Sequence, residues 1–477
     1  MIYPFSVAQL SSAKKLNILS RPLVCIIADK NMLNNGNFII VVEIFIRKRY
    51  NHSNKKMRIK SMLKTKNSEA KIIVFETVKV LLLSLILGLV GGAVGAVFSH
   101  SIALVTEIRG NYSFIICFLP LGGLITVLTY NLIKQQGINT DDVLKSADNG
   151  KKVSPLLCLA VFLSTCITHL FGGSAGREGA ALQIGGSLAS GAIKIFRVND
   201  KNANILVQCG MAAMFSALFG TPLGACVFAL EVIKIGKIKI ISALPCLLSS
   251  FVAYWISGLL GTAREHFDLT SGLTITANDL LKIAVVAMLA SVLSYAFCKL
   301  LHFTEHTAKS LLKNNYIRIF IGGVLIVILT YVIGSFDYNG GGTDVLNQIF
   351  TSGQYKNEAF LLKILFTVIT VGFGYKGGEI VPSLFIGGTF GATLSGILGL
   401  PVAIGSAVGM ASMLSGVTNC TIATVVICLE MFGTEYSLGF ILASVMSFIF
   451  SGFIGLYDNG KKRFYIFSIA SFKDKNE

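Results

Sequence analysis

Apolar stretches alternate with short polar or glycine-containing segments along most of the chain. The apolar runs cover about 72–106, 113–134, 153–171, 177–196, 203–219, 222–237, 241–261, 279–302, 317–335, 359–374, 379–400, 402–417, 420–433 and 437–456. A helix needs about 20 residues to cross the roughly 30 Å hydrocarbon core of a bilayer. Several runs are shorter than this and contain glycine, which is typical of half-helices that meet inside a membrane protein.

The composition agrees with this pattern. Of the 477 residues, 53% are hydrophobic and 14% are charged, whereas soluble domains carry about 25% charged residues. Because the runs have helical length and are rich in glycine, they favour helical spans over a β-barrel. The sequence therefore predicts an all-α polytopic membrane protein in which many helices are tilted or broken. No polar stretch beyond the N-terminal region is long enough for a separate soluble domain.

The net charge of +17 is concentrated near the N-terminus, in RKRYNHSNKKMRIKSMLKTK (47–66), directly before the first long apolar run. Basic residues beside a span mark its cytoplasmic side, so this charge indicates membrane topology and no nucleic-acid partner. The tail 461–477 is also basic, which places both termini in the cytoplasm. We expect residues 1–70 to form a basic arm that is disordered or that precedes the natural start site.

Two halves of the chain repeat each other. Residues 207–231 match 406–430 in register, and GREGAALQIGGSLA (176–189) matches GEIVPSLFIGGTFG (378–391). The repeat predicts a first transmembrane unit over 71–270 and a second over 271–460. An antiparallel repeat brings broken helices of both halves to the bilayer midplane, where transporters bind their substrates.

Glu178 is the first candidate functional residue because it lies in GGSAGREG, directly after an apolar run. A carboxylate facing lipid is costly, whereas a helix N-terminus stabilises negative charge and binds anions. A charged Glu178 could occupy such an anion site itself and leave it when protonated, acting as both gate and proton carrier. The alternative is that Arg177 and Glu178 are loop residues outside the bilayer.

Glu379 is the second candidate, in GYKGGEIVPSLFIGG (374–388). Glycines precede it, and Pro382 suits the first turn of a helix because it lacks an N–H. Glu379 therefore opens another broken helix. The alternative is that it is only a charge that caps this helix.

The stretches THLFGGSAGREG, FGTPLGACVFALE and GGEIVP resemble the CLC family of anion channels and transporters, and most of all its bacterial branch of fluoride/proton antiporters. The resemblance covers about residues 75 to 460. It implies an inverted-repeat fold and a homodimer in the plasma membrane, in which each subunit has its own anion pathway and no cofactor. In that family Glu178 corresponds to the gating glutamate, and chloride-transporting members carry phenylalanine in place of Glu379 or next to it.

The resemblance also implies an anion site. It assigns anion binding to Gly176, Arg177, Gly179, Ile138, Ile380, Val381 and Tyr457. The hydroxyl of Tyr457 would close the site from inside, although an aromatic anchor at the membrane interface is the alternative for this residue. Ile138 and Val381 stand where relatives carry other side chains, and they leave fewer donors than ordinary chloride coordination uses.

Glu231 bears on proton transport. Chloride/proton exchangers of the family carry two adjacent glutamates at this point, and the second accepts protons from inside. Here Val232 replaces the second, so that route is missing. We expect Glu231 and its repeat counterpart Glu430 to be structural.

The favoured function is export of fluoride in exchange for protons, and the alternative is a voltage-gated chloride channel or a chloride/proton antiporter of the same fold. An intramembrane enzyme would need a nucleophile or a metal cluster. The 6 histidines and 10 cysteines are scattered without ligand spacing, so we expect no metal site and no enzyme. The expected partners are the anion, protons, lipid and a second copy of the chain.

Overall fold

The computed structural model describes residues 37–149, 153–233, 239–269, 276–452 and 454–457. These residues form α-helices, labelled α3 to α18, and two 3-10 helices. The chain divides into two units, Met1–Thr77 and Val78–Glu477, and the second holds the candidate site. The tail 461–477 lies outside the described residues.

The helices follow in two series. The first comprises α3 (Asn37–Asn111), η2 (Ser113–Phe118), α4 (Leu119–Leu132), α5 (Thr140–Asn149), α6 (Leu157–Leu170), α7 (Glu178–Ile195), α8 (Asp200–Phe219), α9 (Pro222–Glu231), η3 (Ile240–Ser242) and α10 (Ala243–Leu259). The second comprises α11 (Ala277–Leu311), α12 (Asn315–Ile333), α13 (Thr343–Ser352), α14 (Ala359–Gly372), α15 (Ile380–Leu398), α16 (Val402–Thr418), α17 (Thr421–Phe432) and α18 (Ser437–Phe450).

Helix α3 begins earlier than the sequence led us to expect. It starts at Asn37, so residues 37–70 are helical where we expected a disordered arm. The reason is local, because no glycine or proline occurs between 37 and 87 and Lys, Arg and Leu are good helix formers. Residues 1–36 lie outside the described part of the chain, and the start-site alternative stays a prediction.

The two series correspond helix by helix, from α4 with α12 to α10 with α18. This order confirms the predicted all-α inverted-repeat fold. The short helices α5 and α13 were not expected, since both are too polar to appear as apolar runs. Both begin with Thr-Asp, at Thr140 and Thr343, and this shared start is the signal that could have revealed them.

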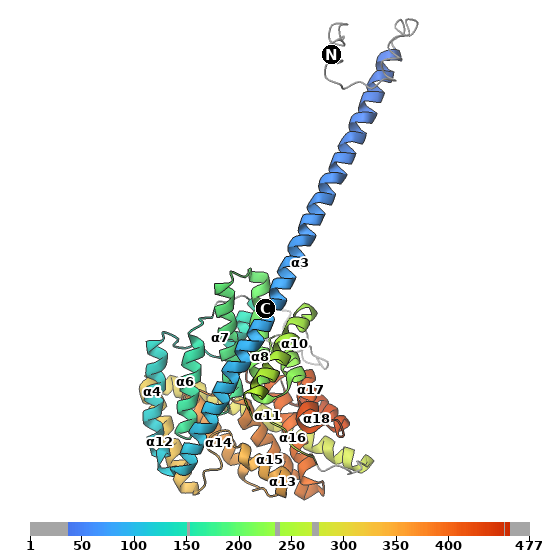
Figure 1. Ribbon diagram of the computed structural model, residues 1–477. Helices are drawn as coiled ribbons and strands as arrows, with labels where there is room; N and C mark the ends of the chain where they lie inside the picture. The colour runs from blue at the N-terminus through green and yellow to red at the C-terminus, as the bar shows by residue number, and fades with distance from the viewer. Residues whose placement is uncertain (1–36, 150–152, 234–238, 270–275, 453, 458–477) are drawn as a thin grey trace, which may run out of the picture. The chain divides into compact units, whose positions relative to one another are not determined.

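Close backbone contacts hold the inner helices together. Helix α7 packs against α8, and α15 packs against α16 (Figure 1). A Cβ added to Gly185 would lie 2.1 Å from the carbonyl oxygen of Gly210, and one on Gly387 would lie 2.4 Å from that of Gly409. Small residues are common at such interfaces because packing, and not water exclusion, drives helix association in lipid.

The outer helices carry the lipid-facing surface. Large apolar side chains are exposed along them, among them Leu82, Leu128, Trp255, Val332 and Ile449. In the described part of the chain, 7 helices are long and apolar enough to cross a bilayer. The protein is therefore a multi-pass membrane protein.

Glu231 and Glu430 each cap the start of a helix in the other repeat. The Glu430 carboxylate accepts the N–H groups of Leu223 (3.0 Å) and Gly224 (2.7 Å) at the start of α9. Glu231, at the end of α9, accepts those of Ile422 (3.3 Å) and Ala423 (2.8 Å) at the start of α17. Each glutamate caps the other's helix, which confirms that both are structural and requires α9 and α17 to run antiparallel.

We predict that Glu430→Ala destabilises the protein. The substitution leaves the N–H groups of Leu223 and Gly224 without their acceptor, and the loss of a helix cap costs roughly 0.5–2 kcal/mol. The thermal midpoint in detergent should fall clearly, and the exposed Glu435 supplies the matched control Glu435→Ala. Equal midpoints for the two variants would contradict the capping role.

Candidate functional site

The starts of α7 and α15 are joined directly to each other. Gly176 and Gly378 form an isolated antiparallel β-bridge, in which each N–H donates to the other's carbonyl oxygen at 2.6 Å. A Cβ on Gly378 would lie 2.4 Å from the nitrogen of Gly179, so this backbone contact requires glycine. Since α7 begins at Glu178 and α15 at Ile380, the positive ends of two helix dipoles face each other here.

The Glu178 side chain is completely buried and folds back over its own helix start. Its Oε2 accepts the backbone N–H of Arg177 at 3.0 Å and lies 3.0 Å from the point where a Cβ on Gly176 would stand. The carboxylate thus occupies the place that the helix start offers to an anion. This geometry disfavours the alternative of a solvated loop residue.

Arg177 holds Glu178 in this position. Its Nε donates to Glu178 Oε1 at 3.3 Å, and its Nη2 donates to Glu265 Oε1 at 2.9 Å. Its Nη1 donates to Ser99 Oγ at 2.8 Å. The guanidinium is therefore shared between two carboxylates. It holds the Glu178 carboxylate less firmly than a guanidinium that paired with Glu178 alone.

Glu379 does not occupy the position in α15 that Glu178 occupies in α7. In the repeat that aligns Gly176 with Gly378, its counterpart is Arg177, and both residues are the N-caps of their helices. Glu379 Oε2 is buried and has no hydrogen-bond partner among the described residues. It lies 3.2 Å from the Cβ position of Gly179, the residue after Glu178. The two glutamates thus approach the bridge from the two helices that it joins.

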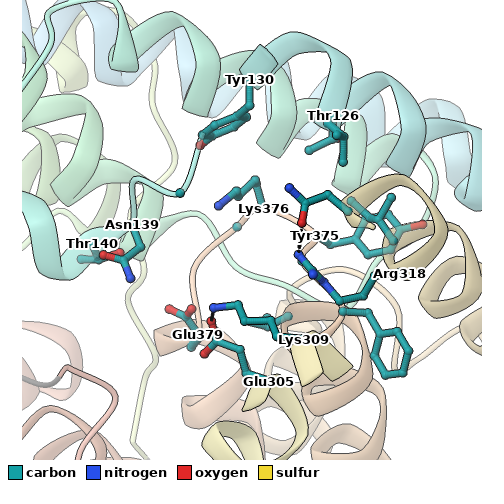
Figure 2. Close-up of a pocket in the computed structure, with 18 of the residues that line it drawn as sticks. Thr126, Tyr130, Asn139, Thr140, Glu305, Lys309, Arg318, Tyr375, Lys376 and Glu379 are labelled. Carbon is teal, nitrogen blue, oxygen red and sulfur yellow. Dashed lines mark hydrogen bonds and ion pairs between the residues drawn. The ribbon is translucent and has the colours of Figure 1, made fainter. Parts of the chain in front are cut away.

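A cavity of about 420 Å³ opens beside Glu379. Figure 2 shows Glu379 on one side of it with Glu305 and Lys309, whose ion pair measures 2.5 Å. Lys376 Nζ stands 4.7 Å from the centre of the Tyr130 ring on another side. The cavity walls carry three cations and three acids, namely Lys309, Arg318, Lys376, Asp141, Glu305 and Glu379.

Tyr457 lines the same cavity. The hydrogen bond of the preceding Leu456 N–H to the Val417 carbonyl (2.7 Å) fixes this segment of backbone. The Tyr457 hydroxyl is buried and has no partner among the described residues. A hydroxyl without a partner beside Glu379 is available to an entering anion, as a lipid-interface anchor would not be.

The other residues of the predicted anion site lie at varying distances from this cavity. Gly137 and Asn139 line it, but Ile138 packs half-buried against the core. Ile380 is fully buried. Val381 fills the space beside Gly176, where an added Cβ would lie 2.8 Å from it, and also contacts Gly341. The structure therefore brings Glu178, Glu379 and Val381 to the bridge, whereas Ile138 is not among the residues that line the cavity.

Sequence reasoning missed the charged residues of the cavity wall. Lys376 stands in GYKGGEIVP, three positions before Glu379, so attention to that motif could have found it. Glu305, Lys309 and Arg318 carry no local signal, because only the packing of α11 and α12 places them at the cavity.

The comparisons with known proteins identify relatives across the membrane region. The family model described as voltage gated chloride channel matches residues 121–452. A chloride/fluoride channel protein of Pseudomonas syringae pv. tomato is 30% identical over 387 residues, which cover 80% of this chain and 85% of that protein. An H(+)/Cl(-) exchange transporter of Vibrio campbellii is 24% identical over 390 residues, 75% of this chain and 82% of that protein.

Solved structures are similar as well. A crystal structure of a CLC-type fluoride/proton antiporter superposes with a TM-score of 0.78 at 32% identity, and the match covers 82% of this chain and 99% of the other. A slow cyanobacterial Cl⁻/H⁺ antiporter matches with a TM-score of 0.67 over 78% of this chain and 94% of the other. At 18% identity the second likeness is one of fold alone.

Proposed function

The chain belongs to the CLC family of voltage-gated chloride channels and related anion transporters, and we propose that it exchanges fluoride for protons. As a CLC-type protein it transports anions through a multi-pass membrane domain. The proposal adds the choice of fluoride, the coupling to protons, and a homodimer in the plasma membrane with cytoplasmic termini. Its outward fluoride movement would be driven by proton entry.

One observation carries the proposal: two glutamates meet at the bridge between two helix starts. Glu178 occupies its helix start with its own carboxylate, whereas Glu379 presents an unpartnered oxygen next to a polar cavity. Buried ionisable groups of this kind in membrane proteins mark ion pathways and proton relays.

Fluoride suits this site because it is small and strongly hydrated. Replacing its water requires closely spaced hydrogen-bond donors, since an unsatisfied buried charge is costly. The first-turn N–H groups of α7 and α15 have no carbonyl partners within their own helices, and the Tyr457 hydroxyl adds another donor. Glu379 in place of an apolar side chain, and the 32% identity to a fluoride/proton antiporter, support the same choice.

The proposed proton route follows from the positions of Glu178 and Glu379. Water in the cavity reaches Glu379, which lines it. An entering proton passes from Glu178 over the glycine contact at Gly179 to Glu379 and leaves through this cavity. A protonated Glu178 loses its charge-assisted bonds to Arg177 and leaves the helix start to an anion. Anion and proton thus use the same junction at different moments, which couples their opposite movements.

We expect the purified protein in proteoliposomes to move fluoride faster than chloride and to move protons in the opposite direction. The measurement is the parallel recording of fluoride, chloride and internal pH after an anion gradient is imposed, with a protonophore as control. Reversal potentials with fluoride against chloride separate a coupled exchanger from a channel. Chloride flux without proton movement would favour the alternative of a chloride channel.

We predict that Glu178→Gln abolishes proton coupling, because glutamine keeps the shape but carries no proton. Glu178→Ala should leave at most an uncoupled anion leak, since it also removes the carboxylate from the helix start. The measurement is the internal pH change driven by a fluoride gradient, with the exposed Glu435→Gln as matched control. Proton movement at the wild-type ratio in either variant would exclude Glu178 as gate and carrier.

Glu379→Gln tests the second glutamate. If Glu379 were only a capping charge, its loss should cost about 1 kcal/mol or less and leave transport unchanged. We expect instead a folded protein, with a thermal midpoint near that of the wild type, that has lost coupled exchange. Unchanged fluoride-driven proton movement in this variant would return Glu379 to the role of a helix cap.

A further inference from the structure

The segment 262–269, which follows α10, brings a second carboxylate to the guanidinium of Arg177. Glu265 Oε1 accepts Arg177 Nη2 at 2.9 Å, and the Glu265 side chain is 17% exposed. Glu178 accepts from the same guanidinium but is completely buried. Water therefore reaches one of the two carboxylates that share Arg177, and none of the transport steps proposed above uses that carboxylate.

The segment 262–269 is fastened to both halves of the membrane domain. The Glu265 N–H donates to the carbonyl oxygen of Phe219 (3.3 Å), the last residue of α8. The Phe267 N–H donates to the carbonyl oxygen of Met431 (3.0 Å) on α17. Backbone hydrogen bonds on each side thus hold Glu265 at the guanidinium, so its position does not depend on the ion pair alone.

This segment lies on the side of the membrane from which proton entry is proposed. His100 Nε2 lies 2.9 Å from the carbonyl oxygen of Leu260, just before the segment begins. Along α3, the distance from Val78 to His100 is about 33 Å at roughly 1.5 Å per residue, enough to cross the roughly 30 Å core of a bilayer. With the cytoplasmic N-terminus proposed above, Glu265 therefore lies on the outer side.

Glu265 opposes the attraction between Arg177 and Glu178. A positive neighbour favours the charged form of a carboxyl group, whereas a negative neighbour favours the protonated form. Arg177 alone would hold Glu178 as a charged carboxylate at the start of α7. The negative charge of Glu265, on the same guanidinium, offsets part of this attraction, so that a proton from outside releases Glu178 more easily.

Other charged or titratable groups surround the start of α7, but they do not share its guanidinium. Among the described residues, only Glu178 and Glu265 form ion pairs with Arg177. The other groups are His100 and Arg109 on α3, His169 on α6, Glu379 before α15, Tyr457, and Arg264, His266 and Asp268 in the segment itself. Glu265 is thus the acid through which the outer side acts on Arg177.

We propose that Glu265 is a positioning residue of the gate, which weakens the hold of Arg177 on the Glu178 carboxylate and so lets Glu178 leave its helix start at a higher pH. This inference rests on the proposed function, but it concerns the pH at which the gate opens and not the choice of anion. A unit charge acting over about 10 Å at an effective dielectric constant of about 20 shifts a protonation equilibrium by about one pH unit.

Glu265→Gln tests the charge alone, because the glutamine side-chain oxygen can still accept the N–H of Arg177. We expect the pH of half-maximal fluoride flux, measured with equal pH on both sides of the liposome membrane, to fall by about one unit. The maximal flux at low pH and the thermal midpoint should stay close to wild type. Glu265→Asp keeps the charge and should keep the wild-type pH profile.

Glu435→Gln is the matched control. Glu435 is exposed and follows the end of α17, the helix to which Phe267 is bonded, so this variant removes a charge near the same segment without touching Arg177. We expect its pH profile to match that of the wild type.

Each outcome decides the inference. An unchanged pH profile in Glu265→Gln, an equal shift in Glu265→Asp or Glu435→Gln, or a lower flux at every pH without a shift would overturn the inference while the proposed function stands. If Glu265→Gln does not fold, Glu265→Ala takes its place with the same criteria. If the wild type moves no protons against fluoride, the proposed function fails by itself, and the pH profile of the anion flux alone tests Glu265.

Discussion

Two hydrogen bonds between Gly176 and Gly378 fix the starts of α7 and α15 against each other, and the rest of the site depends on this contact. It places two positive helix ends together, which is unfavourable unless negative charge lies between them. The Glu178 carboxylate supplies that charge in the structure. A ligand that takes the place of the Glu178 carboxylate must itself be negatively charged. The two helix starts therefore determine the charge of the ligand, and the surrounding side chains determine which anion it is.

Residues that follow the repeat hold the helices together, whereas the two glutamates of the site depart from the repeat. Glu231 and Glu430 follow the symmetry and cap each other's helices. The site glutamates do not, because Glu379 aligns with Arg177 and not with Glu178. This offset of one residue places one carboxylate under a guanidinium and leaves an oxygen of the other without a partner. Two carboxylates in different surroundings can hold and release a proton differently, as a relay requires.

The sequence predicted the two helices of the site closely. The runs at 177–196 and 379–400 became α7 and α15 within two residues, because length and hydrophobicity determine a span. It did not reveal the polar helices α5 and α13, whose amphipathic turns lack an apolar run. The site glutamates were found from motifs, but Glu305, Lys309 and Arg318 were not, because only the packing of α11 and α12 places them at the cavity.

Anion transport imposes a balance on these charges. Two facing helix starts would hold a small anion strongly, and a pathway conducts only if the ion can also leave. Glu178 supplies the opposing effect, because its charged carboxylate competes for the same helix starts. In the proposed exchange, protonation of Glu178 removes this competitor and lets the anion in, and deprotonation expels the anion again. The two helix starts and the titratable glutamate thus act together in the proposed exchange, because an anion held strongly by the helix starts leaves only when the carboxylate returns.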